Sequence, residues 1–437
     1  MAPKLKRLPQ LLVADSTGNL MPHPTLKMCG RSGHQFAVID PAELIPLPKG
    51  SDLFALPGRT AFGYDDQSGD FVPVDEGPQG EEIRPMAAFM APTYTAHYLT
   101  AYRNLPQAPT LPLFAYTAIG ELDGEYYVAA TRVDPDRRQD HELFDDALVL
   151  KKIKQLKAER PDNRLVAHLA NCATTNNCFA AKNFFLERFE APIPSSPQCN
   201  SDCVGCLSFQ KPEAGFPSTQ NRIQFVPSPE EIAACVLPHF EKAQHPVASF
   251  GQGCEGDPLM NPPLLIESVK AIRAKTSLGT INLNSNGSRP DAVRDLMKAG
   301  LDAIRVSMNS AQEPWYNAYY RPRGYTFSQV RESLKAVAEM GGKASINYFT
   351  FPGVSDREKE IEALLKLIKE SGLHLIQWRN LNLDPDLYLD SLGDVDSAGK
   401  AMGVKFLLAE VKRQFPHVRY GYFNPAWREE AEKQKTH

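Results

Sequence analysis

The chain has 437 residues, of which 42% are hydrophobic and 23% charged, and its formal net charge of −4 excludes the strongly basic surface typical of nucleic-acid-binding proteins. The length suggests two or three domains. Because no apolar run reaches the roughly 18 residues of a membrane-spanning helix and the N-terminus lacks the apolar stretch of a secretory signal, we expect a cytoplasmic protein with no membrane or nucleic-acid partner, whose thiols stay reduced.

Residues 1–145 predict an irregular, β-rich region. The stretch "LFAYTAIGELDGEYYVAATRV" places Tyr, Val and Thr in two arms around Asp123-Gly124, and Asp-Gly between such arms is a strong β-hairpin signal. No motif in this region indicates a chemistry. Three roles stay open for it: covering the mouth of the following domain, recognising a substrate, or binding a partner.

Residues 146–187 predict a helical bridge between this β-rich region and the next domain. In "DDALVLKKIKQLKAE" the apolar residues fall at Leu148, Leu150, Ile153 and Leu156, which is a helical pattern. The stretch "CFAAKNFFLERF" continues with a second apolar face.

Residues 188–382 alternate between short strands and amphipathic helices. The strand patterns are "RFEAPIP", "PVASFG", "TINLNSN", "DAIRVSMNS", "ASINYFTF" and "HLIQWRNL". Two of the helices are expected to begin with capping boxes, Ser228 with Glu231 and Ser355 with Glu358. Strands and helices that alternate at this spacing indicate βαβ units and a parallel sheet.

The predicted fold class is therefore α/β. Six strands fit into this range, whereas a closed eight-stranded barrel needs about 250 residues, so we expect a partial (β/α)6 barrel of parallel strands. A doubly wound open sheet is the rival. In either fold, ligands bind at the carboxyl ends of the strands. Residues 383–437 predict a C-terminal helical extension, in which "VKFLLAEVKRQF" directs its apolar residues inward.

Three cysteines, Cys199, Cys203 and Cys206, follow the first strand in "SSPQCNSDCVGCLSFQ". Four thiolates close a structural zinc site or a cubane cluster, whereas three leave one metal position open. On zinc, that position would hold water for hydrolysis; on a [4Fe–4S] cluster, it exposes one iron. The short loop favours the cluster, because catalytic zinc sites take histidine or carboxylate from separated elements and no histidine lies within about 20 residues.

This Cys-x3-Cys-x2-Cys pattern after the first strand of a parallel barrel resembles the hallmark of the radical S-adenosylmethionine (radical SAM) enzymes. The stretch "GQGCEGDPL" at the second strand looks like the family's glycine-acid-proline motif, which holds the amino group of SAM. "NLNSNG", "IRVSMNS" and "NYFTFPGVSD" resemble the ends of the third, fourth and fifth strands. On these matches, the residues expected to bind SAM are Gly253, Glu255, Gly256, Asp257, Asn284, Asn286, Ser307 and Asn347.

The resemblance covers about 188–382, and the chain departs from the family in two places. Gly205 precedes the last cysteine, where the family usually has an aromatic residue that shields the adenine. Asp257 stands where glutamate is commoner.

The resemblance implies an enzyme whose cofactors are SAM and a [4Fe–4S] cluster held by Cys199, Cys203 and Cys206. An electron donor such as ferredoxin or flavodoxin would reduce the cluster. SAM would then be cleaved to methionine and a 5′-deoxyadenosyl radical, which would take a hydrogen atom from an unknown substrate in the barrel mouth. The cofactors would supply the hard step, and the protein would orient them.

Other functions stay open. One is a metal-dependent hydrolase that uses the open position on water, and another is a non-catalytic iron–sulfur protein that transfers electrons or scaffolds a complex. A third possibility is an enzyme that keeps the cluster and SAM but cleaves a different C–S bond of SAM or transfers its methyl group.

Further residues have open roles. Cys172 and Cys178 could bind a second cluster with Cys29, although buried cysteine usually packs as a small apolar group. Cys254 could be a thiol near the substrate. Arg321 and Arg323 could pair with the carboxylate of SAM or of a substrate, and Trp378 could contact adenine or belong to the core. The histidines that show no ligand spacing are His168, His239, His245 and His374.

Overall fold

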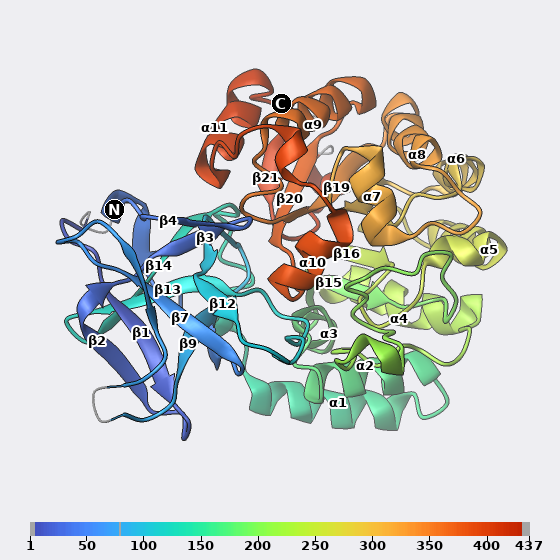
Figure 1. The fold of residues 1–437 in the computed structure, drawn as a ribbon. Helices are drawn as coiled ribbons and strands as arrows, with labels where there is room; N and C mark the ends of the chain where they lie inside the picture. The colour runs from blue at the N-terminus through green and yellow to red at the C-terminus, as the bar shows by residue number, and fades with distance from the viewer. Residues whose placement is uncertain (1–4, 78–79, 431–437) are drawn as a thin grey trace.

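The computed structural model describes residues 5–77 and 80–430. Figure 1 shows two bodies side by side: an antiparallel sheet built by the first third of the chain, and a parallel sheet surrounded by helices. No helix within the described ranges is long and apolar enough to cross a membrane.

The N-terminal body is a 14-stranded sheet whose main path runs β12-β7-β2-β1-β9-β13-β11-β3-β4. The hairpin expected at Asp123-Gly124 is confirmed, because Leu122 pairs with Glu125 in antiparallel register. The strands are β1 (Gln10–Asp15), β2 (Leu20–Lys27), β3 (Gly30–Ser32), β4 (Gln35–Ala37), β5 (Leu44–Pro46), β6 (Asp52–Ala55), β7 (Arg59–Tyr64), β8 (Phe71–Val74), β9 (Ile83–Phe89), β10 (Tyr94–Ala96), β11 (Leu99–Thr100), β12 (Tyr102–Asn104), β13 (Thr117–Leu122) and β14 (Glu125–Arg132).

Three helices follow: α1 (Asp146–Glu159), α2 (Arg164–Thr174) and α3 (Phe179–Phe185). The inward face of α1 differs from the expected one, because Val149 and Ile153 are buried whereas Leu148 and Leu150 are exposed. Positions four apart share one face of a helix, and α1 buries only this narrow stripe. The stripe belongs to the same apolar cluster as the core of the parallel sheet.

The second body is a seven-stranded sheet in which all strands are parallel and follow chain order, β15 to β21. Sequential order is typical of a barrel, whereas a doubly wound sheet reverses its order at a switch point. The partial barrel is therefore confirmed, and the rival is wrong. The strands are β15 (Arg188–Ile193), β16 (Gln244–Phe250), β17 (Thr280–Ser285), β18 (Ala303–Met308), β19 (Lys343–Thr350), β20 (Leu375–Asn380) and β21 (Arg419–Gly421).

The seventh strand, β21, was not expected from the sequence and comes from the C-terminal extension. The segment after β21 reaches back to the first strands, where the side-chain amide of Asn424 donates to Glu190 on β15 at 2.7 Å and to Ser249 on β16 at 3.1 Å. The open sheet is thus curled into most of a barrel, and its two edges are joined by one side chain.

Helices cover the outside of this sheet. They are α4 (Pro229–Lys242), α5 (Pro262–Arg273), α6 (Pro290–Ala299), α7 (Glu313–Tyr320), α8 (Phe327–Glu339), α9 (Glu358–Ser371), α10 (Pro385–Leu392) and α11 (Val404–Gln414). Every residue of β17 is buried, as expected for a parallel strand that is covered on both faces.

One of the two expected capping boxes is confirmed. In α4, Ser228 and Glu231 each accept the other's backbone N–H. The second is wrong, because the Ser355 hydroxyl accepts the N–H of Phe351 in the turn that precedes α9. The helix begins at Glu358 with Arg357 as its N-cap and no side-chain cap.

The N-terminal sheet is fastened to the barrel by buried polar contacts. The guanidinium of Arg59 donates to the carboxylate of Asp384 at 2.9 Å, and both side chains are less than 5% exposed. The same carboxylate accepts the N–H of Leu111 at 2.8 Å. Nearby, Arg31 pairs with Asp386. Because a buried ion pair is costly to leave half-made, these contacts fix how the sheet sits on the barrel.

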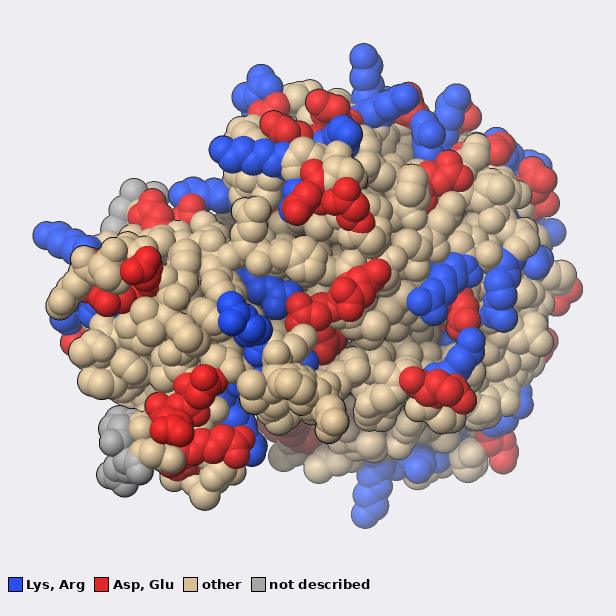
Figure 2. Space-filling view, viewed as in Figure 1, with Lys and Arg blue, Asp and Glu red and all other residues tan. Residues whose placement is uncertain are grey.

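The two bodies also approach closely at a pair of glycines. The N–H of Gly33 donates to the carbonyl of Pro352 at 2.9 Å, and a Cβ added at Gly353 would lie 1.9 Å from the nitrogen of Gly33. Only glycine fits such a contact. On the face drawn in Figure 2, acidic and basic side chains are intermingled over both bodies.

Candidate functional site

A cavity of about 260 Å³ lies at the carboxyl ends of the parallel strands. Its wall combines the loop after β15, the loop after β16, and the ends of β17 to β20. The structure brings every residue expected at the site to this wall: Cys199, Cys203, Cys206, Gly253, Glu255, Gly256, Asp257, Asn284, Asn286, Ser307 and Asn347.

The loop after β16 is hydrogen-bonded to the segment that leads into the cysteines. The N–H of Gly256 donates to the carbonyl of Ser196, and the N–H of Asp257 donates to that of Gln198, both at 2.7 Å. A Cβ added at Gly256 would lie 1.9 Å from the carbonyl oxygen of Gln198. Glycine is required here, because any side chain would separate the two loops.

The two acids of this loop hold it in place. The buried carboxylate of Glu255 accepts the N–H groups of Ser195, Ser196 and Gln252 at 2.7 to 3.0 Å. Burial raises the pKa of Glu255 to about 7. The carboxylate of Asp257 accepts the N–H of Asn286 at 2.7 Å and the hydroxyl of Ser285 at 2.8 Å. Both acids therefore act first on the shape of the cavity wall.

The asparagines on the wall differ in how fully they are paired. The side-chain amide of Asn286 donates to Asn200 at 2.7 Å and so ties the third strand to the cysteine loop. That of Asn284 donates to the carbonyl of Gly251 at 2.9 Å. Asn347 donates to the hydroxyl of Ser307 at 3.4 Å, but its own carbonyl oxygen has no partner among the described residues. Of these three asparagines, Asn347 therefore has a buried polar atom that the described residues leave without a partner.

The cysteine loop contains a basic side chain that sequence reasoning missed. A guanidinium nitrogen of Arg222 lies 3.4 Å from the sulfur of Cys206. Burial raises the pKa of the Cys199 thiol to about 11 and that of Cys203 well above its ordinary value. Burial penalises the charged form of both thiols, and the guanidinium of Arg222 partly opposes this effect on the pKa of Cys199. No spacing rule links Arg222 to the cysteines, so only the fold places it there.

An aromatic residue lies beside Gly205. A Cβ added at Gly205 would lie 2.8 Å from the hydroxyl oxygen of Tyr319 on α7. Tyr319 and its neighbour Tyr320 both line the cavity. An aromatic side chain is therefore present where the cysteine loop has none, although it comes from a helix more than 100 residues later in the chain.

Two arginines on the wall, Arg305 on β18 and Arg379 on β20, were also missed. The Nε of Arg305 is buried and has no partner among the described residues, and burial lowers the pKa of its guanidinium to about 10. Arg321 and Arg323, which the sequence suggested for this role, do not belong to the wall described for the cavity. Instead, Arg323 donates to the carbonyl of Cys199 at 2.8 Å and supports the loop.

The remaining cysteines do not gather as a second cluster with Cys29. Cys29 lies in the N-terminal sheet, where its thiol donates to the carbonyl of Phe62, whereas Cys172 and Cys254 belong to the core of the second body. Cys254 is buried and lies outside the cavity wall. Trp378 is fully buried and packs edge-on against Tyr348, as a core residue does.

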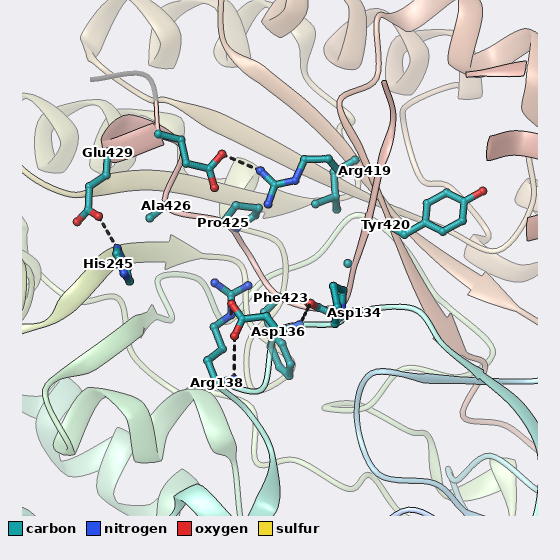
Figure 3. Close-up of a pocket in the computed structure, with 14 residues that line it drawn as sticks. Asp134, Asp136, Arg138, His245, Arg419, Tyr420, Phe423, Pro425, Ala426 and Glu429 are labelled. Carbon is teal, nitrogen blue, oxygen red and sulfur yellow. Dashed lines mark hydrogen bonds and ion pairs between the residues drawn. The ribbon is translucent and has the colours of Figure 1, made fainter. Parts of the chain in front are cut away.

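A larger cavity of about 350 Å³ lies at the opposite end of the sheet (Figure 3). It is formed around the amino ends of β16, β20 and β21. Its charged groups are paired: His245 contacts Glu429 at 2.5 Å, and Arg419 contacts Glu430 at 2.7 Å. No cysteine belongs to its described wall. Its size alone does not make it a site for chemistry.

Comparison with known proteins gives one family. Residues 193–368 match the family model described as the radical SAM superfamily. No curated protein matches the chain.

The chain is similar to several solved structures. One is anSMEcpe with bound AdoMet, at 17% identity over 44% of this chain and 52% of that chain, with a TM-score of 0.34. Another is SuiB of Streptococcus suis bound to S-adenosylmethionine, at 14% identity over 63% and 61%, with a TM-score of 0.37. A third is the FeFe-hydrogenase maturase HydG of Carboxydothermus hydrogenoformans, at 13% identity over 58% and 67%, with a TM-score of 0.33. The chain spans about half of the first of these proteins, and likenesses this distant carry no argument about function.

Residues 193–368 are thus similar to the radical SAM superfamily of enzymes, with no subfamily resolved.

Proposed function

We propose that the protein cleaves SAM reductively at a [4Fe–4S] cluster bound by Cys199, Cys203 and Cys206 and acts on a substrate held in the same cavity. The observation that carries this proposal is the convergence of the cysteine loop and of the polar ends of four further strands on one cavity wall. When bound, the two cofactors supply one-electron cleavage of SAM to methionine and a 5′-deoxyadenosyl radical, which takes a hydrogen atom from the substrate.

The thiols fit a multi-iron group better than a single ion. Ligands of one zinc ion lie about 3.6–3.8 Å apart, given Zn–S and Zn–N bonds of about 2.3 and 2.0–2.1 Å. Among the described residues, the group found with all ligand atoms within 4.8 Å of one another is His168, Cys172 and Cys254. The sulfurs of Cys199, Cys203 and Cys206 do not meet that distance and are therefore too far apart for one zinc ion. This supports a cubane at the loop over the single-ion hydrolase.

The polar wall fits SAM in charge and in free bonding groups. Asn347 and Arg305 both line the cavity, and each has a buried side-chain atom without a partner among the described residues; SAM carries hydroxyl and carboxylate groups that such side chains bind. Gly253 and Gly256, the residues proposed to meet the amino group of SAM, also line the cavity, and Glu255 holds their loop by accepting the N–H of Gln252. Tyr319, which lies beside Gly205 and lines the cavity, is the aromatic residue that we assign to the adenine.

The N-terminal sheet has a positioning role in this proposal. The side chain of Asn380, at the end of β20, lines the cavity. It accepts the N–H of Ala96 at 2.8 Å and donates to the carbonyl of Tyr94 at 3.0 Å, both on β10. The sheet thereby fixes one side of the cavity mouth.

Anaerobic reconstitution with iron and sulfide tests the proposal. We expect about four irons and four sulfides per chain and, after addition of dithionite and SAM, formation of 5′-deoxyadenosine. Ferredoxin or flavodoxin should replace dithionite as the electron donor. The matched control is Cys235→Ala, which removes a buried thiol of α4 that lies outside the cavity. It should retain both readouts.

Two other outcomes would contradict the proposal. One zinc per chain with no deoxyadenosine would favour the hydrolase. A cluster whose spectrum does not respond to SAM would favour an electron carrier or a scaffold. Analysis of the spent SAM also separates cleavage of the 5′ C–S bond from cleavage of another bond or from methyl transfer.

A further inference from the structure

Three metal-binding side chains converge at a second point, outside the cavity. The ligand atoms of His168, Cys172 and Cys254 all lie within 4.8 Å of one another. Both cysteines are buried, at 1% and 5% exposure, and the histidine is half-buried. Within the described ranges, this is the group of histidine, cysteine and acidic side chains found to meet that distance.

The three residues come from two distant parts of the chain. His168 and Cys172 are one helical turn apart on α2 and therefore share a face. Cys254 lies on the loop after β16, where its carbonyl accepts the N–H of Ile223 at 2.8 Å. Sequence reasoning found no ligand spacing at His168, and the four-residue step to Cys172 was the signal that could have revealed it.

The distances fit a single zinc ion. The sulfur of Cys172 lies 3.5 Å from Nε2 of His168. In a tetrahedral site with the usual Zn–S and Zn–N bond lengths, a sulfur and a nitrogen ligand lie about 3.6 Å apart. Thiolate and imidazole are also the ligands that zinc prefers.

A fourth soft donor lies close by. The N–H of Cys178, which precedes α3, donates to the carbonyl of Cys172 at 3.1 Å. A structural zinc site is closed by four protein ligands. Cys178 is taken as the fourth because this hydrogen bond holds its backbone beside that of Cys172.

We propose that His168, Cys172, Cys178 and Cys254 bind one structural Zn²⁺ ion. The ion joins α2 and the start of α3 to the loop after β16. The next residues of that loop, Glu255 to Asp257, form part of the cavity wall. The zinc therefore fastens the helices of residues 146–185 behind the wall, at a point that the substrate does not reach.

Zinc must be measured without interference from the cysteine loop. The protein for the test is the full chain with Cys199, Cys203 and Cys206 all replaced by alanine, so that failure of the proposed function does not affect the result. We expect about one zinc per chain by mass spectrometry of metals after dialysis. Replacement of zinc by Co²⁺ should give the visible bands of a tetrahedral ion and a thiolate charge-transfer band.

Single substitutions in this background identify the ligands. His168→Gln, Cys172→Ser and Cys254→Ser should each lower zinc content at least tenfold. Cys178→Ser should weaken zinc binding at least tenfold in competition with a chromogenic chelator. Cys235→Ser is the matched control, because its buried thiol lies on α4 and outside the group, and it should keep one zinc.

Several outcomes would overturn the inference. They are an absence of zinc in the parent protein, zinc that survives all of the ligand substitutions, iron with sulfide in place of zinc, or a disulfide between Cys172 and Cys254 found after thiol trapping. If a buried cysteine variant fails to fold, His168→Gln still tests the site, because this histidine is only half-buried and its replacement should leave the protein folded. Unchanged zinc affinity in Cys178→Ser would overturn its assignment as the fourth ligand.

Discussion

The two ends of the parallel sheet each carry a cavity, and they differ in how their polar groups are used. At the amino end, the larger cavity is surrounded by ion pairs, His245 with Glu429 and Arg419 with Glu430 (Figure 3). At the carboxyl end, the smaller cavity has three free thiols and buried polar atoms without partners, on Asn347 and Arg305. Buried side-chain atoms without a partner occur beside both cavities, since the Nε of Arg138 at the amino end is another, so the free thiols are what distinguishes the carboxyl end.

The comparison separates polar groups whose hydrogen bonds and ion pairs hold the fold from thiols on which the apolar core does not depend. Glu255 and Asp257 belong to the first kind although they line the cavity, because their carboxylates accept backbone N–H groups. The three cysteines of the cavity belong to the second kind, although Cys206 contacts the guanidinium of Arg222. Substitutions of each kind should therefore have separable effects.

The largest effect is expected at Cys203. Cys203→Ala should lower deoxyadenosine formation at least 100-fold, because two thiols cannot hold the cluster that three are proposed to hold. The apolar core does not depend on this loop, so the circular dichroism spectrum and the melting temperature should stay close to those of the parent. An insoluble Cys203→Ala protein would contradict this assignment, because the Cys203 thiol would then be essential to the fold.

The next largest effect is expected at Asp384, whose carboxylate pairs with Arg59 and accepts the N–H of Leu111. Asp384→Ala leaves the buried guanidinium of Arg59 without its carboxylate partner, which should lower the free energy of unfolding by about 3–5 kcal/mol. Urea denaturation measures the change. Asp390→Ala, an exposed position on the same helix, is the control and should change stability by less than about 0.5 kcal/mol. Equal losses in the two variants would contradict the assignment of Asp384 to the fold.

A smaller, pH-dependent effect is expected at Glu360. Its carboxylate accepts bonds from Ser310, Ala311 and Tyr348, but burial outweighs these bonds and raises its pKa above the ordinary 4.5. Because the folded state binds this proton more tightly than the unfolded state, the protonated carboxyl contributes stability that is fully present below pH 4.5. This contribution is lost as the pH rises through the pKa of the folded state.

Glu360→Gln, which stays neutral, should therefore flatten the decline of stability with rising pH. Denaturant unfolding at a series of pH values from 4 upward measures the slope. A slope as steep in the variant as in the parent would assign the pH dependence to other groups.

The smallest effect is expected at the amino-end cavity. Arg419 and Glu430 are both more than 40% exposed, and exposed ion pairs contribute about 0–1 kcal/mol. Arg419→Ala should leave deoxyadenosine formation unchanged and lower stability by no more than about 1 kcal/mol. A large loss of turnover in this variant would assign a function to the larger cavity.

The sequence predicted the parts of the site that follow from strand ends. The cysteine triplet and the motif from Gly253 to Asp257 lie directly after strands, and parallel strands end at one edge of a sheet. Arg222 and Tyr319 could not be predicted, because they reach the site from a loop and a helix that have no fixed spacing to the cysteines.

The parts of the fold that were missed are short or nonlocal. The three residues of β21 are too few to show a strand pattern, and pairing with β20 gives them their conformation. Cys254 meets His168 only after the chain has folded, across 86 positions. The domain limits inferred from the sequence, at residues 145, 187 and 382, stay predictions.

The position of β21 determines how the protein can be shortened. A version ending at residue 382 would expose the full edge of β20 to pairing with another molecule, which is a common route to aggregation. It would also remove the amide of Asn424 that bonds to Glu190. Any trimmed version for crystallography should therefore keep the chain through residue 430.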